Sequence, residues 1–466
     1  MDQEETIAAI ATPLGEGGLA VIRLTGARAL AIADGCFQPA GKSSVKPSVA
    51  PTHSLQFGKI VRGDKMVDEV LLAVLRAPRT FTREDTVEIS CHGGLLPAKL
   101  VLETLLAGGA RLAEPGEFTK RAFLNGRLDL AQAEAVADLI HARTELALAA
   151  ANQQLAGQLS QRINQLRDDL MHTLAHVEAH IDFPEEDIAP DTKTQLLGRL
   201  ANGIAYMDKL LATAGEGQLL RRGIRAAIIG RPNAGKSSLL NQLLGRDRAI
   251  VSPIPGTTRD TIEETANIRG LPVAFIDTAG LREAHDDLER EGVRRSRETL
   301  LQAELILHVL DASQSMTGAD QQYLAEFSAK KRILVRNKID LPVKLELPAR
   351  YLVPGHPSLV TPSVVEVSCV TGAGIEALKD AIKNLVWSGE IRAEMLQVAI
   401  NARHQDALNR ARAAAHQAAE ALAADATLEL VALDLRTAAN AVGEIVGKTT
   451  TEDLLDSIFS TFCIGK

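Results

Sequence analysis

The chain is poor in aromatic residues and cysteines and contains no long apolar run. Phe, Trp and Tyr make up only 3% of its 466 residues, while Ala and Leu dominate long stretches, which favours a helix-rich protein. The cysteines are Cys36, Cys91, Cys369 and Cys463. They are scattered and lack C-x-x-C spacing, so neither a zinc site nor a disulfide framework is expected. No apolar stretch approaches the roughly 20 residues of a membrane-spanning helix, so we expect no membrane contact.

An excess of basic residues and a targeting pattern are also lacking. The formal net charge of −8 argues against a surface coated in positive charge, so any nucleic acid must be met by a local patch or by a partner. The first residues, Met1-Asp-Gln-Glu-Glu5, are acidic and differ from a signal or transit peptide. We expect a cytoplasmic protein.

The length predicts two to four domains, and the patterns divide the chain into several parts. Residues 1–120 mix strand signals with turns and predict an α+β domain. The predicted strands are Ala20–Ile22, Leu55–Phe57, Val70–Leu75 and Val87–Ile89, and Leu95–Leu106 is a predicted helix.

Helical spacing of apolar residues covers residues 121–217 and returns in residues 387–466. Between them, after Gly215-Glu-Gly217, residues 218–386 alternate strands and helices, as in a parallel sheet. One all-α domain interrupted by an inserted α/β domain explains this order. Two separate helical domains remain the alternative.

A phosphate-binding loop is the most informative motif in the inserted part. Gly230-Arg-Pro-Asn-Ala-Gly-Lys-Ser237 reads G-x-x-x-x-G-K-S, between the apolar run Ile224–Ile229 and a leucine-rich helix. In such a loop, backbone N–H groups converge on phosphates, Lys236 reaches the outer phosphates, and the Ser237 hydroxyl can bind Mg²⁺. A chance glycine turn is the alternative, which the motifs downstream oppose.

Three further motifs predict that the nucleotide is GTP. Asp277-Thr-Ala-Gly280 can hold Mg²⁺ through water and sense the γ-phosphate, and Thr258 in Gly256–Asp260 is the candidate switch threonine on the metal. Asn337-Lys-Ile-Asp340 follows a strand and can recognise the guanine ring through its carboxylate. Ser368 would close over the base. The expected GTP-binding residues are Asn233, Ala234, Gly235, Lys236, Ser237, Ser238, Ser252, Thr257, Thr258, Asp277, Thr278, Ala279, Gly280, Asn337, Lys338, Asp340 and Ser368.

Hydrolysis cannot follow the Ras pattern, because the residue after the Asp277–Gly280 motif is Leu281 and not Gln. Either hydrolysis is very slow or the catalytic group comes from elsewhere. Acidic residues just beyond it, Glu289 among them, could replace that Gln or simply form a solvated helix face. Asn233 could ligate a monovalent cation beside the phosphates or serve only as a turn residue.

Together with these motifs, the two chain ends resemble the MnmE (TrmE) family of tRNA-modifying GTPases over essentially the whole chain. The matching segments are Thr6–Pro13, Gly15–Gly18, Gly116–Phe118, Arg121–Asn125, Leu128–Glu134, Ile181–Glu186 and Phe462–Lys466. The resemblance implies a folate-binding N-terminal domain and a Ras-like G domain inserted into a helical domain. It also implies a homodimer that joins the FAD-dependent partner MnmG in a heterotetramer or larger complex.

In this family a tetrahydrofolate, as the 5-formyl or 5,10-methylene form, supplies a one-carbon unit. The complex adds an aminomethyl or carboxymethylaminomethyl group to C5 of the wobble uridine of tRNA. The resemblance assigns K⁺ to Asn233 and to a loop with Ser252, Ile254 and Thr257, and Mg²⁺ to Ser237 and Thr258. Glu289 matches the acidic residue that positions water indirectly.

For folate, the matching positions are Arg23, Glu84, Arg127 and Lys466. Arg127 stands where a lysine is common, which keeps the charge and changes the geometry. Cys463 matches a cysteine needed for modification, and its thiolate could assist one-carbon transfer or nucleobase chemistry.

Two other functions compete with this interpretation: an Era- or Der-type GTPase of ribosome assembly, and a GTP-gated scaffold without chemistry. The former would need an RNA-binding module, and no basic G-x-x-G module or second G domain is recognisable. His172, His176 and His180 share a helical face, but without a third-ligand pattern they predict a helix face and not a zinc site.

Overall fold

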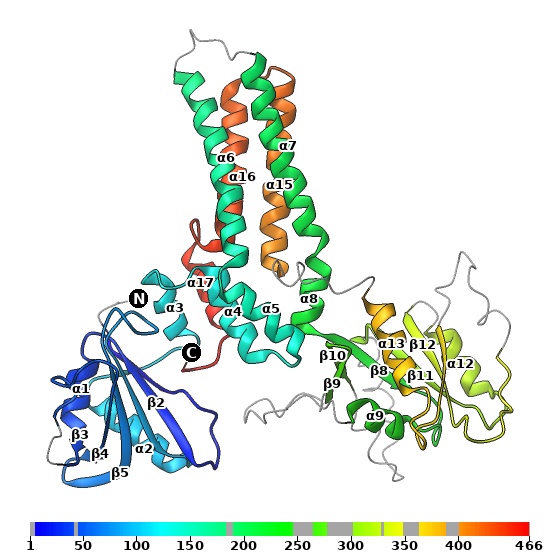
Figure 1. Cartoon of the computed structure of the whole chain (residues 1–466), viewed down its shortest axis with the longest axis horizontal. Coiled ribbons are helices and arrows are strands. Elements are labelled where there is room, and N and C mark those ends of the chain that lie inside the picture. Colours follow the sequence, from blue (N-terminus) through cyan, green and yellow to red (C-terminus); the bar gives the residue numbers. More distant parts are fainter. Residues whose placement is uncertain are drawn as a thin grey trace.

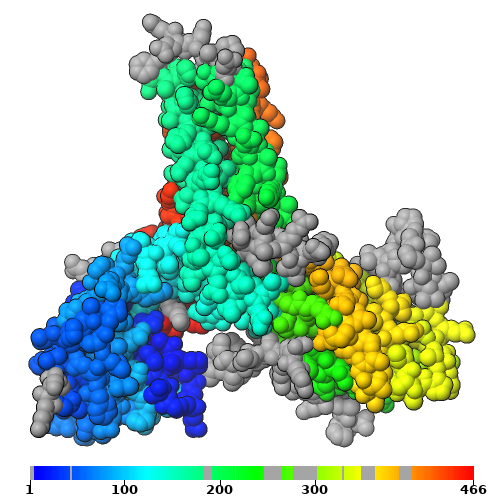
Figure 2. Space-filling view, in the orientation of Figure 1, coloured from blue at the N-terminus to red at the C-terminus, as the bar shows by residue number. Residues whose placement is uncertain are grey.

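A computed structural model describes residues 5–41, 45–182, 190–245, 264–276, 302–327, 330–347, 363–387 and 400–465. Three parts are distinguishable: an N-terminal α+β domain, an upright helical bundle, and a G domain (Figure 1). Figure 2 shows the N-terminal and G domains on opposite sides of the foot of the bundle.

The N-terminal domain is a seven-stranded sheet with strand order β3-β4-β5-β6-β2-β1-β7. The predicted strands lie inside β2, β4, β5 and β6, and the predicted helix is α2, so these predictions are confirmed. Sequence patterns missed β1, β3 and β7, which are short. The elements are β1 (Ile7–Ile10), β2 (Leu19–Thr25), α1 (Ala29–Cys36), β3 (Phe37–Pro39), β4 (Ser54–Arg62), β5 (Lys65–Leu75), β6 (Thr86–His92), α2 (Leu95–Ala107) and β7 (Arg111–Leu112).

Alternation along the strands gives this sheet two different faces. Val70, Leu72 and Val74 of β5 point into the core that includes residues of α1 and α2. Their neighbours, such as Ala73, therefore point to the opposite face. On that face, Ala73 pairs with Glu88 of β6, which pairs with Arg23 of β2, so the sheet register brings Arg23 and Glu88 side by side.

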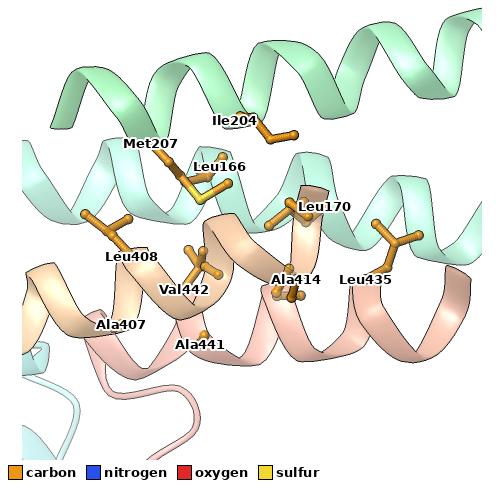
Figure 3. Packing of buried hydrophobic residues seen from close by; sticks show 14 of the residues in the cluster. Leu166, Leu170, Ile204, Met207, Ala407, Leu408, Ala414, Leu435, Ala441 and Val442 are labelled. Atoms are coloured by element: carbon orange, nitrogen blue, oxygen red, sulfur yellow. The ribbon is translucent and has the colours of Figure 1, made fainter. Parts of the chain in front are cut away.

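Both helical stretches contribute to one bundle, formed mainly by α6, α7, α15 and α16. Its core joins residues such as Leu166, Ile204, Leu408 and Val442, which interdigitate in Figure 3. The elements are α3 (Glu117–Leu124), α4 (Leu130–His141), α5 (Glu145–Leu155), α6 (Gln158–Asp182), α7 (Pro190–Ala212), α8 (Ala214–Arg222), α15 (Ala402–Ala423), α16 (Leu428–Val446) and α17 (Glu452–Phe459). Because one hydrophobic core contains both stretches, a single interrupted domain is confirmed over two separate ones.

The G domain contains a six-stranded sheet with strand order β13-β12-β11-β8-β10-β9. All its pairings are parallel except that of β9 with β10, as in Ras-like domains. The elements are β8 (Ile224–Ile229), α9 (Lys236–Leu244), β9 (Glu264–Ile268), β10 (Leu271–Phe275), β11 (Leu305–Asp311), α12 (Gly318–Glu326), β12 (Lys331–Asn337), β13 (Ser363–Val367) and α13 (Ile375–Val386).

The change from helical to α/β structure comes later than the glycine pair suggested. Gly215 and Gly217 lie inside α8, which continues to Arg222 and stops at Gly223, with a φ of 71°. A Cβ on Gly223 would lie 2.6 Å from the carbonyl oxygen of Pro272, so the turn needs glycine there. Within the described ranges, none of the helices has the length and apolar character needed to cross a membrane.

Candidate functional site

The phosphate loop runs from the end of β8 to the start of α9 and is shaped by two glycines. Gly230 has a φ of 147°, and a Cβ on it would lie 2.3 Å from the carbonyl oxygen of Val309. Gly235 has a φ of 98°, and its Cβ would lie 2.1 Å from the side-chain nitrogen of Asn337. Since both positions combine left-handed backbone with close approach, only glycine gives this loop its path.

The loop ends at the N-terminus of α9, where anions are favoured. Gly235 is the N-cap residue and offers no side chain to cap the helix. The N-terminus of a helix attracts phosphate through its first N–H groups and its dipole. Ser237 and Ser238 follow in this first turn. The arrangement fits the phosphates of a nucleoside triphosphate, and Mg²⁺ on the Ser237 hydroxyl stays a prediction.

Lys236 lies folded against the phosphate loop. Its Nζ donates hydrogen bonds to the carbonyl oxygens of Gly230 at 3.0 Å and Arg231 at 2.9 Å. Burial lowers the pKa of this ammonium group below its ordinary value. These contacts hold a positive charge over the loop, where the outer phosphates of a bound nucleotide would lie.

Asn337 connects the phosphate loop to the base-binding loop. It is only 1% exposed, and its side-chain amide donates to the Ala234 carbonyl oxygen at 2.9 Å. Its side-chain oxygen accepts from the backbone N–H of Cys369 at 3.2 Å. Asn337 thus fixes two loops relative to each other. Sequence reasoning named it a guanine-site residue without this bridging role.

Lys338 and Asp340 follow at the same edge of the sheet. Lys338 donates to Asp311 Oδ2 at 2.6 Å. Burial raises the pKa of the Asp311 carboxyl, but Lys338 and Ser313 outweigh it and leave that pKa below its ordinary value. Asp340 is exposed, so its carboxylate is accessible to a guanine base as the prediction requires. Ser368 is buried and begins the loop after β13.

Asn233, the candidate K⁺ ligand, is exposed in the phosphate loop with a φ of 61°. The other expected residues of the GTP, metal and hydrolysis sites lie outside the described residues and stay predictions: Ser252, Ile254, Thr257, Thr258, Asp277, Thr278, Ala279, Gly280 and Glu289.

A second candidate site lies on the N-terminal sheet, where Arg23 meets the other end of the chain. Arg23 pairs with Glu88 at 2.8 Å and donates to the carbonyl oxygen of Gly465 at 3.3 Å. Its guanidinium also lies 5.6 Å from the centre of the Phe118 ring. The structure therefore brings a predicted folate residue beside the C-terminal motif, whose last residue, Lys466, is outside the described residues.

Arg127 lies against an apolar cluster that includes Phe118 and Phe81, and Glu84 is joined to α3 through Arg121. The carboxylate of Glu84 accepts from Arg121 at 3.2 Å. Arg127 donates to the carbonyl oxygen of Thr80 at 2.6 Å and stacks on Phe81 at 5.2 Å. Stacking of this kind suits arginine better than lysine, which accounts for the residue found here.

The C-terminal segment is held in place by packing as well as by Arg23. Phe459 and Phe462 join Leu130 and Ala133 of α4 in a small core. Further along, a Cβ on Gly465 would lie 2.6 Å from the carbonyl oxygen of Ile10. This docking leaves the Cys463 side chain exposed.

Arg121, Glu117 and Glu88 are site residues that sequence reasoning missed. Arg121 and Glu117 form a buried pair at 3.0 Å, and Arg121 then supports Glu84. The segments Gly116–Phe118 and Arg121–Asn125 were noted for their resemblance, which was the available signal. Glu117 and Arg121 lie in the short helix α3, and a buried charged group needs a partner. Because some of those partners come from other parts of the fold, the role of these residues could not be predicted from the helix alone.

The candidate histidines of α6 show no ligand geometry. His172 and His176 are exposed and His180 is half-buried. Within the described ranges, the structure holds no group of three or more His, Cys, Asp or Glu residues able to bind a metal ion.

The fold and the first site define a P-loop GTP-binding protein with two additional domains. Family models match at both ends of the chain: "GTP-binding protein TrmE N-terminus" over residues 6–127 and "MnmE helical domain" over residues 130–463. The "tRNA modification GTPase MnmE" of Geobacillus kaustophilus is 47% identical, with 100% of both chains covered. That of Chloroflexus aurantiacus is 48% identical over 99% of this chain and 100% of its own. The chain belongs to the MnmE family of tRNA modification GTPases.

Among solved structures, that of an Aquifex aeolicus Era variant bound to GDP.AlF4⁻ is 31% identical to this chain. The match covers 41% of this chain and 66% of that one, with a TM-score of 0.26. A similarity this low gives no support to the Era-type alternative.

Proposed function

We propose that this chain hydrolyses GTP to drive a folate-dependent modification of the wobble uridine of tRNA. The product is an aminomethyl or carboxymethylaminomethyl group on C5, made together with the FAD-dependent partner MnmG. The observation that carries this proposal is that one chain holds a complete phosphate loop and, elsewhere, an arginine-rich site at which both chain ends meet. We expect it to work in the cytoplasm, where its tRNA substrates are.

The second site fits a folate by the chemistry of its donors. Arg23 and Arg127 present guanidinium groups that suit the glutamate carboxylates, and each is stacked on a phenylalanine ring. The Glu84 carboxylate suits the donors of the pterin ring. When bound, tetrahydrofolate supplies the one-carbon unit, while these residues orient it beside the exposed Cys463.

A homodimer is supported by the free face of the N-terminal sheet. Leu55 and Phe57 of β4 and Leu71 of β5 are exposed by 64%, 53% and 40% and lie on the face that bears Arg23. A second copy of the chain would cover this apolar surface, which is continuous with the folate site through Ala73 and Glu88.

Titration calorimetry with 5-formyl-tetrahydrofolate tests the folate part of the proposal. We expect saturable binding by the intact protein and weaker binding when Lys466 is deleted. Well-folded protein that binds GTP but no folate would contradict the modification function. Nucleoside analysis of tRNA incubated with this protein, the partner and a tetrahydrofolate then tests the product.

The rate of GTP hydrolysis tests the proposed roles of K⁺ and Glu289. We expect a lower rate when Na⁺ replaces K⁺ at equal ionic strength, because a cation at Asn233 would offset charge that develops in the transition state. Glu289→Ala should slow hydrolysis and spare GTP binding. Equal rates in both salts would remove the cation from the mechanism, and a normal Glu289→Ala rate would remove that residue.

A further inference from the structure

A buried acidic residue of α12, Asp320, contacts the phosphate loop from the side. Its carboxylate is 1% exposed, and its Oδ1 lies 3.0 Å from Nε of Arg231, the second residue of the loop. Its Oδ2 accepts from the backbone N–H of Thr317 at 2.9 Å and from the Thr317 hydroxyl at 2.8 Å. One oxygen therefore caps α12, while the other holds Arg231.

The position of Arg231 matters because its backbone supports the phosphate-binding lysine. The Arg231 carbonyl oxygen accepts from Lys236 Nζ at 2.9 Å and from the Ala234 N–H at 3.3 Å. Asp320, Arg231 and Lys236 thus form a chain of contacts from α12 to the ammonium group. The side chain of Arg231 is 19% exposed, so replacement of Asp320 would leave it free to turn to solvent.

Two other buried ionisable residues, His308 and Arg332, contact α12 at Tyr323 and Leu324. Burial lowers the pKa of His308 to about 4; Asp320 opposes this shift and Arg332 adds to it, so the imidazole is neutral near pH 7. Arg332 donates to the carbonyl oxygen of Leu324 at 2.7 Å, within α12. Arg231 is the cation through which Asp320 reaches the loop, because Arg231 belongs to the loop and its Nε lies 3.0 Å from the Asp320 carboxylate.

We propose that Asp320 is a positioning residue for the GTP site, which acts through Arg231 to hold the first half of the phosphate loop and its lysine in place. The inference rests on the proposed GTPase function. Asp320 belongs to none of the GTP-binding motifs. It lies on a helix that faces the loop only because β11 is the neighbour of β8 in the sheet.

Fluorescence titration of the full-length protein with N-methylanthraniloyl-GDP and -GTP tests the proposal. Arg231→Gln leaves the α12 cap untouched and should weaken the binding of both nucleotides by about tenfold, because the ion pair that holds the loop would be lost. Asp320→Asn keeps an oxygen for Thr317 and should give a similar loss. The double variant should be no weaker than either single one, because both remove the same contact.

Arg269→Gln is the control, because Arg269 forms an exposed ion pair with Asp380 on α13, at 2.7 Å, in the same domain but outside the phosphate loop. It should bind both nucleotides as the unchanged protein does. Trp387, the single tryptophan, is 2% exposed beside α8 and β10, so its fluorescence on heating shows whether each variant stays folded.

Unchanged affinity in a folded Arg231→Gln protein would overturn the inference and leave the GTPase function standing. A loss in Asp320→Asn alone would also overturn it, since Asp320 would then act only through α12. If the unaltered chain bound neither nucleotide, the proposed function and the inference would fall together.

Discussion

Arg23 Nη1 donates to the carbonyl oxygen of Gly465 at 3.3 Å, although 442 positions separate the two residues. Near this contact, Gly116 donates its N–H to the carbonyl oxygen of Cys463 at 3.4 Å. The C-terminal motif is therefore part of the N-terminal site. A substitution at either end of the chain should therefore alter the structure of the site at the other end.

Gly465→Ala should displace the C-terminal segment from β1. Gly465 has a φ of 92°, and a Cβ there would meet the Ile10 carbonyl oxygen at 2.6 Å. We expect at least about tenfold weaker folate binding in calorimetry, with nucleotide affinity unchanged. Gly63→Ala is the control, because Gly63 has a φ of 61° with open space around it. Equal folate affinity in both variants would show that the segment does not shape the site.

Gly235→Ala should destroy nucleotide binding. The added Cβ would lie 2.1 Å from Asn337 Nδ2, and the φ of 98° adds backbone strain. To relieve the clash, Asn337 would have to give up its bond to Ala234, so the phosphate and base loops would separate. Nucleotide titration should show a loss of about 100-fold or more. Gly318→Ala in the same domain, where nothing lies within 4 Å, should bind normally.

Glu134→Gln should destabilise the helical domain more strongly than a substitution that breaks a surface ion pair. Glu134 on α4 forms two 2.9 Å contacts with Arg403 and lies 2.8 Å from His404 Nε2. Breaking a buried pair from one side costs about 3–5 kcal/mol in free energy of unfolding. Arg412→Gln, which breaks an exposed pair with Asp208, should cost less than about 1 kcal/mol. Urea unfolding followed by circular dichroism compares the two.

The buried contacts of Glu134 also predict that the free energy of unfolding depends on pH. Burial alone raises the pKa of Glu134, but the hydrogen bond from His404 and the ion pair with Arg403 outweigh it and leave that pKa well below 4.5. Burial also lowers the pKa of His404, and the Nδ1 atom of His404 accepts from the Asn401 N–H at 3.3 Å.

A depressed pKa in the folded state means that the stabilisation by Glu134 is complete above the unfolded value of 4.5 and is lost as the pH falls below it. Between about pH 5 and 3, the free energy of unfolding should therefore fall less steeply in Glu134→Gln than in the unaltered protein. Identical slopes would contradict a charged Glu134 in the fold.

Thiol reactivity should separate Cys463 from the other cysteines. Cys463 is exposed, whereas Cys36, Cys91 and Cys369 are buried, and burial raises the pKa of each of these three thiols to about 11. Ellman's reagent near about pH 7.5 should label one cysteine per chain rapidly, because the thiolate is the reactive form. Cys463→Ser should remove the fast phase. A second fast thiol in that variant would show that one of the buried sites opens.

The sequence by itself determined the nucleotide site and the order of the domains. A phosphate loop is a continuous segment whose strand, glycines and lysine are all local, so its chemistry could be predicted from Gly230 to Ser237 without knowledge of the rest of the fold. Helical and strand periodicity likewise predicted α2, β5 and β8, because each depends on which face of one segment is buried.

Tertiary structure decided the contacts between distant segments. Two glycines suggested a domain change at Gly217, but α8 continued to Gly223 because the packing of Leu220 against Leu271 and Trp387 outweighs a weak helix propensity. Asp320 belongs to no motif, and Arg121 and Glu134 lie in segments noted only for their resemblance. Each is a charged residue that can be buried only beside an opposite charge. Strand order and helix packing across the chain decide which residue provides that opposite charge.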